Sequence, residues 1–344
     1  MRGFYGPIEV TLHNRTFHES SPISSIDVYN NLLATSGYDK SIRVWIIKKS
    51  VLTINTNIYH LAPESSIEFE FYKELGGFES AVNVCRFYKG DDQSKDDFLI
   101  VGAGFDRIVL FNKDNRFNIY LSNNDECTDI LWINKTTVIA SFFSGRIVVI
   151  NLIFKYTNNE LVNVNQETVF NESLHSSAIR GICFNEKWSC LNTHSLDNSS
   201  KTFLLKNNKL KLISKIRNNI DKSTGIFKRN GFFDDSLYVI CKKRMLEFYC
   251  YPFKEANIYK RLGPFNSSIV KIVKNCYFLV VACTKGIYTF DRHLNRKYFV
   301  ESAAYGPIND VLLVDEIIYY CSEDGFVSTI RPKRNDWKFK INIY

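Results

Sequence analysis

Short runs of alternating apolar and polar positions, separated by tight polar turns, recur along the chain. The first copy has an apolar run at 22–28, a second at 31–36, a turn at 37–41, and a third run that ends at Trp45. Period-two alternation over four to eight residues predicts half-buried β-strands, and clusters of Gly, Asp and Ser mark the reversals. The pattern therefore predicts a unit of consecutive antiparallel strands.

The same unit recurs six more times, in copies that keep the order strand, turn, strand, tight turn, strand. Aligned starts fall at 23, 82, 127, 179, 227, 269 and 308, so the intervals are 59, 45, 52, 48, 42 and 39 residues. These intervals lie near the ~40–45 residues of a propeller blade, with loop insertions where they are longer. The repeats predict seven blades.

Each copy is a small sheet with apolar residues on both faces, so it needs neighbours on both sides. Radial stacking buries both faces and leaves only short edges. The segment Ile8–Leu12 alternates in the same way and is predicted to be the outer strand of the last sheet, which closes the ring. We expect an all-β, seven-bladed β-propeller over residues 1–344, with the closing strand at 8–12 and a short tail at 333–344.

Composition narrows the class of protein. The chain is 45% hydrophobic and 23% charged, which is typical of globular domains and excludes disorder and coiled coils. The net charge is +8, but Lys is abundant together with Asn, Ile, Phe and Tyr, which AT-rich codons encode, so the charge alone predicts no nucleic-acid partner.

Nine cysteines, an odd number with no CxxC pair, are typical of buried free thiols in a reducing compartment. The apolar runs have strand length and no signal segment is expected, so we predict an intracellular protein with no membrane partner.

One segment, 37–45, reads Gly-Tyr-Asp-Lys-Ser-Ile-Arg-Val-Trp and resembles the signature of the WD40 repeat family. The resemblance implies that a turn carboxylate accepts backbone N–H bonds, and that a histidine precedes the first strand. Copies three, five and six lack the turn aspartate, so we expect looser turns there. The implied structural residues are the aspartates Asp39, Asp106, Asp197 and Asp324, the tryptophan Trp45, and the histidines His18 and His175.

Four segments in collinear order resemble the middle-sized, WD-repeat subunits of chromatin assembly factor 1. They are 8–14, 67–87, 226–232 and 308–326, and the resemblance extends from residue 8 to about residue 332. The segment Ile-Phe-Lys-Arg-Asn-Gly-Phe at 226–232 is similar to a Phe-Phe-Arg-Arg-x-x-Phe stretch of that family, which the related histone regulator HIRA shares.

This resemblance implies a non-catalytic nuclear scaffold in a complex that deposits histones H3 and H4 during replication- or repair-coupled nucleosome assembly. The implied partners are the large subunit of chromatin assembly factor 1, histones H3 and H4, and the small histone-binding WD subunit. The resemblance does not extend to contact with the anti-silencing type of histone chaperone, because relatives make it through a short basic segment within a long tail, where this sequence has 333–344. No cofactor and no sequence-specific nucleic-acid partner is expected.

Two groups of residues are candidates for partner contact. Lys228 and Arg229 belong to the 226–232 segment, and an acidic loop suits a basic histone tail. The alternative interpretation of the acidic loop is a solvated turn between strands. Its residues are Asp91, Asp92, Asp96 and Asp97.

Three alternative functions stay open. The first is a HIRA-like subunit of replication-independent deposition, and the second is a scaffold in ribonucleoprotein assembly. The third is a hydrolase or lyase with its site in the central channel. No G-x-S-x-G, P-loop or H-E-x-x-H motif occurs, and the first strands of the copies offer mostly Ile, Val and Ser, which disfavours the enzyme. Aromatic residues are expected at core positions, so no base-stacking surface is predicted.

Overall fold

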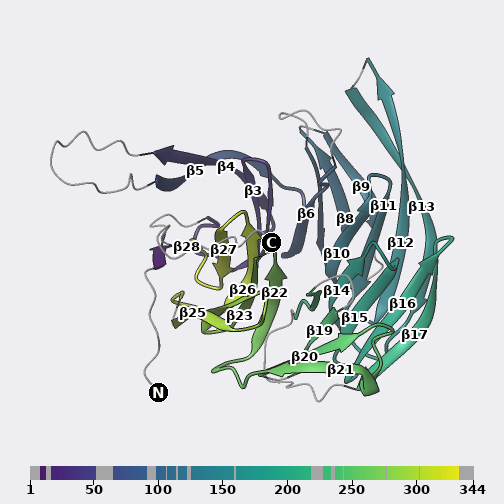
Figure 1. Cartoon of the computed structure of the whole chain (residues 1–344). Coiled ribbons are helices and arrows are strands. Elements are labelled where there is room, and N and C mark those ends of the chain that lie inside the picture. The colour runs from purple at the N-terminus through teal and green to yellow at the C-terminus, as the bar shows by residue number, and fades with distance from the viewer. Residues whose placement is uncertain are drawn as a thin grey trace, which may run out of the picture.

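The computed structural model describes residues 8–12, 17–51, 65–90, 98–105, 107–113, 115–121, 125–158, 160–217, 228–233, 237–242, 244–275, 277–301 and 303–332. These residues form 28 strands and one 3-10 helix, η1 (Glu255–Asn257). The strands make seven four-stranded antiparallel sheets grouped around an axis (Figure 1). The fold is a multi-blade antiparallel β-propeller, so the all-β propeller prediction is confirmed. None of the helical structure in the described ranges is long and apolar enough to cross a membrane.

We number the sheets by the position of their first strand along the chain. Sheet 1 contains β2 (Ile23–Tyr29), β3 (Leu32–Gly37), β4 (Ile42–Val51) and β5 (Ser65–Leu75); sheet 2 contains β6 (Val82–Phe87), β7 (Leu99–Gly104), β8 (Arg107–Asn112) and β9 (Asn115–Leu121). Sheet 3 contains β10 (Cys127–Asn134), β11 (Thr137–Phe142), β12 (Arg146–Thr157) and β13 (Glu160–Ser173); sheet 4 contains β14 (Ile179–Asn185), β15 (Cys190–Ser195), β16 (Ser199–Lys206) and β17 (Lys209–Arg217).

The remaining three sheets have the same strand order. Sheet 5 contains β18 (Gly231–Phe232), β19 (Leu237–Lys242), β20 (Met245–Cys250) and β21 (Ile258–Leu262); sheet 6 contains β22 (Ile269–Lys274), β23 (Phe278–Cys283), β24 (Gly286–Asp291) and β25 (Arg296–Glu301). Sheet 7 contains β26 (Ile308–Val314), β27 (Ile317–Ser322), β28 (Val327–Pro332) and, from the other end of the chain, β1 (Ile8–Leu12).

Strand β1 has the position predicted for the closing strand. It pairs antiparallel with β28, with Ile8 opposite Pro332 and Leu12 opposite Ser328. Because β1 precedes sheet 1 and completes sheet 7, this pairing ties the N-terminal part of the chain to the C-terminal part.

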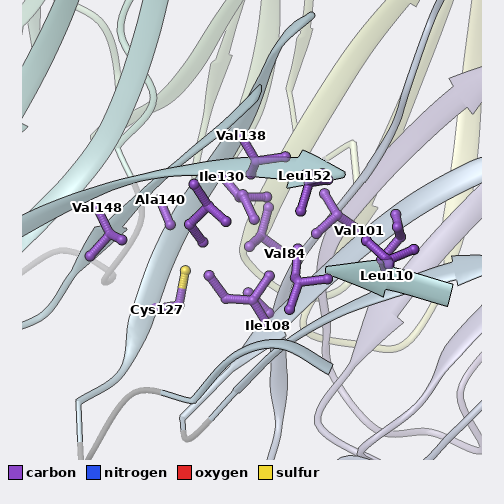
Figure 2. Packing of buried hydrophobic residues seen from close by; sticks show 14 of the residues in the cluster. Val84, Val101, Ile108, Leu110, Cys127, Ile130, Val138, Ala140, Val148 and Leu152 are labelled. Carbon is purple, nitrogen blue, oxygen red and sulfur yellow. The ribbon is translucent and has the colours of Figure 1, made fainter. Parts of the chain in front are cut away.

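A cluster of buried apolar side chains fills each interface between neighbouring sheets, including the interface between sheets 7 and 1. The largest lies between sheets 2 and 3, where Ile108 and Leu110 of β8 meet Ile130 of β10 and Val148 of β12 (Figure 2). Burial of one such side chain stabilises the fold by about 1.5–3 kcal/mol. The seven clusters explain why each copy needs a neighbour on both of its faces.

Two features depart from the regular repeat. The first strand of sheet 5 is only Gly231–Phe232, instead of a strand from about residue 227, and residues 218–227 lie outside the described ranges. In sheet 3, β12 and β13 continue beyond the other strands as a long two-stranded ribbon, at the upper right of Figure 1. The seven cysteines whose side chains the structure describes are all free thiols.

Candidate functional site

The turn signature of sheet 1 forms a buried hydrogen-bond chain. His18 Nδ1 lies 2.8 Å from Asp39 Oδ1, and His18 Nε2 lies 2.8 Å from the Thr35 hydroxyl. The indole N–H of Trp45 donates to the same hydroxyl over 3.1 Å. The side chains thus join the segment before β2, strands β3 and β4, and the turn between them.

Sheet 4 repeats this arrangement with one change. His175 Nδ1 lies 2.8 Å from Asp197 Oδ2, and His175 Nε2 lies 2.7 Å from the Thr193 hydroxyl. Phe203 occupies the position of the tryptophan, so no indole N–H reaches Thr193, and the Thr193 hydroxyl donates to Lys201 O at 3.2 Å. Burial would raise the pKa of Asp197, but hydrogen bonds from His175 and Ser199 outweigh it and hold that pKa well below its ordinary value.

The remaining two turn aspartates are Asp324 and Asp106. Asp324 accepts the backbone N–H groups of Tyr305, Gly306 and Phe326 at 3.0–3.1 Å, without a histidine. Asp106 lies outside the described ranges.

The turn of sheet 3 has a carboxylate from a different part of the chain. Asp125, just before β10, accepts from Ser144 N at 3.1 Å and from Arg146 Nε at 3.0 Å. This turn therefore has a substitute for the missing turn aspartate, which sequence analysis did not foresee when it predicted a looser turn.

A second group of polar side chains, which we call the channel cluster, lies on or beside the first strands of five sheets. Its members are Arg86 on β6, Asp129 on β10, Arg229 before β18, Lys271 on β22 and Asp310 on β26. Arg229 lies 3.3 Å from Asp129 and 3.5 Å from Asp310, Arg86 lies 3.4 Å from Asp129, and Lys271 lies 2.7 Å from Asp310. Two carboxylates thus hold three cations that come from sheets 2, 5 and 6.

Both carboxylates also accept hydrogen bonds from a neighbouring sheet. Asp310 Oδ2 accepts from Ile26 N of sheet 1 at 3.2 Å and from the Ser25 hydroxyl at 2.9 Å. Asp129 Oδ2 accepts from Ile182 N of sheet 4, also at 3.2 Å. Each carboxylate therefore bonds the next sheet in the ring as well as the cations.

Burial and nearby charges have opposite effects on the pKa values of the side chains in this cluster. Burial would raise the pKa of Asp310, but the charges of Lys271, Arg229 and Arg86 outweigh it and hold that pKa well below its ordinary value. Burial lowers the pKa of Lys271, and the charge of Asp310 opposes that effect. Asp310 is therefore ionised at neutral pH, and its proton affinity is too low for a general base near neutral pH.

A recurring hydrogen bond ties the first strands to one another. Asn83 Nδ2 donates to Cys127 O at 2.9 Å, and Asn309 Nδ2 donates to Ile23 O at 2.8 Å. Ser24 donates in the same way to Val82 O. These three polar residues hold the same position in sheets 2, 7 and 1, directly after the first residue of the strand, so one device connects three pairs of neighbouring sheets.

The two groups of candidate partner-binding residues have different positions. Lys228 and Arg229 are only 2% and 3% exposed, and Arg229 belongs to the channel cluster. Lys228 N donates to Arg180 O, and a side chain at Gly181 would collide with the Lys228 carbonyl oxygen, so close backbone packing holds this segment against β14. Partner contact through Lys228 and Arg229 stays a prediction. Asp91, Asp92, Asp96 and Asp97 lie outside the described ranges.

Sequence analysis missed the channel cluster. The expectation that the first strands offer mostly Ile, Val and Ser overlooked the charged residues that these strands carry in all sheets except sheet 5, and charges from different copies meet only when the ring closes. A signal was present: Ser25, Asp129, Lys271 and Asp310 all follow the same register shift in their first strands. Aligned copies with polar residues at one position of an apolar strand indicate side chains directed at the channel.

Among the described residues, no group of three or more His, Cys, Asp or Glu side chains is arranged to hold a metal ion. A hollow of about 450 Å³ lies between sheets 5 and 6. The stacked rings of Tyr288 and Phe299, 4.2 Å apart, form one wall, and Arg244, Lys285 and Glu301 lie around it.

The fold and the two His–Asp–Thr networks define the class of protein: a multi-blade antiparallel β-propeller, consistent with the WD40 type. No protein-family model matches the chain, and comparison with curated proteins found no match.

Proposed function

We propose that this chain is a non-catalytic scaffold subunit of a chromatin assembly complex, which deposits histones H3 and H4 in replication- or repair-coupled nucleosome assembly. The observation that carries the scaffold role is the channel cluster, in which buried charges connect first strands around the ring. A framework tied in this way presents its loops in fixed positions, so a partner segment loses entropy on binding but the propeller loses little. The resemblance of four collinear segments to the WD-repeat subunits of chromatin assembly factor 1 supports the choice of complex.

We take the ring to be a seven-bladed WD40 propeller, with one blade for each four-stranded sheet and β1 as its closing strand. The proposed partners are the large subunit of chromatin assembly factor 1, histones H3 and H4, and the small histone-binding WD subunit, and the proposed location is the nucleus. The paired state of Asp129 and Asp310 supports a non-catalytic role, because both carboxylates are occupied by cations and backbone N–H groups.

Purification from the protein's own cells tests the choice of complex. The chain is tagged at its N-terminus and recovered at moderate salt, with a tag-only strain as the control, and associated proteins are identified by mass spectrometry. We expect a large charged subunit together with histones H3 and H4. Ribosomal or splicing proteins without histones would refute the chromatin role, and recovery of HIRA-type partners would replace it with replication-independent deposition.

The acidic loop is tested in the same system. The variant D91N/D92N/D96N/D97N removes four negative charges at nearly constant side-chain size. We expect weaker recovery of histones, because a basic tail loses its electrostatic partner. Unchanged recovery of H3 and H4 would show that these aspartates form only a solvated turn.

A further inference from the structure

The turn between the second and third strands of each sheet begins at a structurally equivalent residue. In five sheets this residue donates its backbone N–H to the connection that leads into the first strand of the same sheet, at 2.8–3.0 Å. In sheet 2 the equivalent N–H, that of Phe105, bonds the Ser80 hydroxyl of the matching connection instead. The five pairs are Tyr38–Pro22, Phe143–Glu126, Leu196–Ala178, Thr284–Ser268 and Glu323–Pro307.

The residues at this position are not uniform around the ring. Sheets 1, 2 and 3 have Tyr38, Phe105 and Phe143, with exposed fractions of 47%, 45% and 48%. Sheets 6 and 7 have Thr284 and Glu323 there. The three aromatic residues therefore form an arc on one face over three consecutive sheets, which we call the aromatic arc. Aromatic residues were expected only at core positions, so this exposure is a correction.

Negative charge lies beside the aromatic arc. The Phe143 N–H donates to the Glu126 carbonyl oxygen, which places the Glu126 backbone next to one end of the arc, and the Glu126 carboxylate accepts from Asn83 Nδ2 of sheet 2 at 2.7 Å. Burial raises the pKa of Tyr38, and the charges of Glu323 and Glu126 add to the rise, so both carboxylates act on the Tyr38 hydroxyl. These two carboxylates are opposite in sign to the chain's net charge of +8.

We propose that the aromatic arc is a docking surface for an extended, Lys- or Arg-bearing peptide segment of a partner protein. An extended segment gains about 3.3 Å per residue, so a short one reaches turns on three successive sheets. Aromatic faces bind apolar side chains and cations, and the two glutamates favour a cationic partner over an acidic one. This inference rests on the scaffold function proposed above, but not on the identity of the complex.

Selection from random 12-residue peptides displayed on phage tests the proposal with the full chain as bait. Enriched peptides are synthesised with a fluorescent label, and their affinities are measured by anisotropy. We expect enrichment of Lys, Arg and apolar residues, and at least about tenfold weaker binding to Y38S/F105S/F143S, since interface aromatics dominate binding energy. The variant E126Q/E323Q is expected to weaken binding severalfold and to reduce its salt dependence.

A matched control removes three exposed tyrosines elsewhere, in Y72S/Y259S/Y277S, and is expected to keep wild-type affinity. Circular dichroism confirms that both triple variants are folded. Enrichment of acidic peptides, equal loss in both triple variants, or unchanged affinity of the arc variant would overturn the proposal. An RNA result would also overturn it: a single-stranded RNA 20-mer binds the wild-type protein and the control variant but not the arc variant, while no peptide binds. If peptide binding depends on the arc but no chromatin subunit copurifies, the chromatin role fails and the docking surface stands.

Discussion

Asp310 is the carboxylate on which the channel cluster depends most. It lies close to Lys271, Arg229 and Arg86 and accepts a backbone N–H from Ile26, and it is fully buried. Removal of its charge leaves buried cations without compensation, which typically costs about 3–5 kcal/mol. We therefore expect D310N to lower the free energy of unfolding by that amount, measured by urea denaturation at pH 7.

Two further variants make this prediction specific. The substitution E316Q removes an exposed carboxylate from the same sheet and is expected to leave the unfolding midpoint unchanged. The double variant D310N/K271M removes a cation together with the carboxylate, so it is expected to recover part of the lost stability. A wild-type midpoint for D310N would show that the cluster does not stabilise the ring.

The two buried histidines of sheet 4 predict acid sensitivity. Burial lowers the pKa of His175, and burial together with Arg180 and Lys228 lowers that of His194 well below the ordinary value of 6.5. Below about pH 6.5 the unfolded chain binds protons at these sites and the folded chain does not, so stability falls with pH. Each histidine contributes up to about 1.4 kcal/mol per pH unit until the pH reaches its folded-state pKa. Asp197, with its lowered pKa, adds a further loss only below about pH 4.

Urea unfolding between pH 7.5 and pH 5 measures this slope. We expect H194Q to reduce the slope, because the larger of the two proton-binding differences disappears. The variant H293Q changes an exposed histidine and serves as the control. The same slope in H194Q and the wild-type protein would contradict the assignment.

At the residue scale, the sequence predicts contacts between residues of the same copy and misses contacts between residues of different copies. The networks of His18 with Asp39 and His175 with Asp197 join residues about 20 positions apart within one copy, so a short signature reveals them. Arg229 and Asp129 are 100 positions apart and belong to different copies of the repeat. Their pairing depends on how sheets 2 to 7 converge, which no single copy encodes.

At the element scale, β1 completes sheet 7 and adds to the closure that the packing of sheet 1 against sheet 7 provides. Its five register pairs with β28 join residues 8–12 to that sheet. A truncation that begins at residue 13 exposes β28 as an unpaired edge, and such edges recruit other strands. We expect a lower unfolding midpoint and aggregation, measured by thermal denaturation with light scattering.

Complementation in trans distinguishes strand pairing from a nonspecific effect of truncation. A synthetic peptide of residues 1–16 is expected to restore the midpoint of the truncated protein, because it supplies the same strand. A scrambled peptide of identical composition is the control. A truncated chain with wild-type stability, or equal rescue by both peptides, would show that β1 is dispensable for closure.

At the scale of the whole molecule, ring closure determines how the protein unfolds. In a linear array each repeat contacts only its neighbours and the ends can fray, so stability is a sum of nearly independent terms. Here every sheet has a buried cluster on both sides, and loss of one interface opens the ring and exposes two apolar faces. We expect L110A, between sheets 2 and 3, and I308A, between sheets 6 and 7, each to lower one shared unfolding transition by about 2–5 kcal/mol. Scanning calorimetry checks this: a single peak that moves in both variants supports a cooperative ring, whereas a second peak in either variant would mean that the sheets unfold in separate groups.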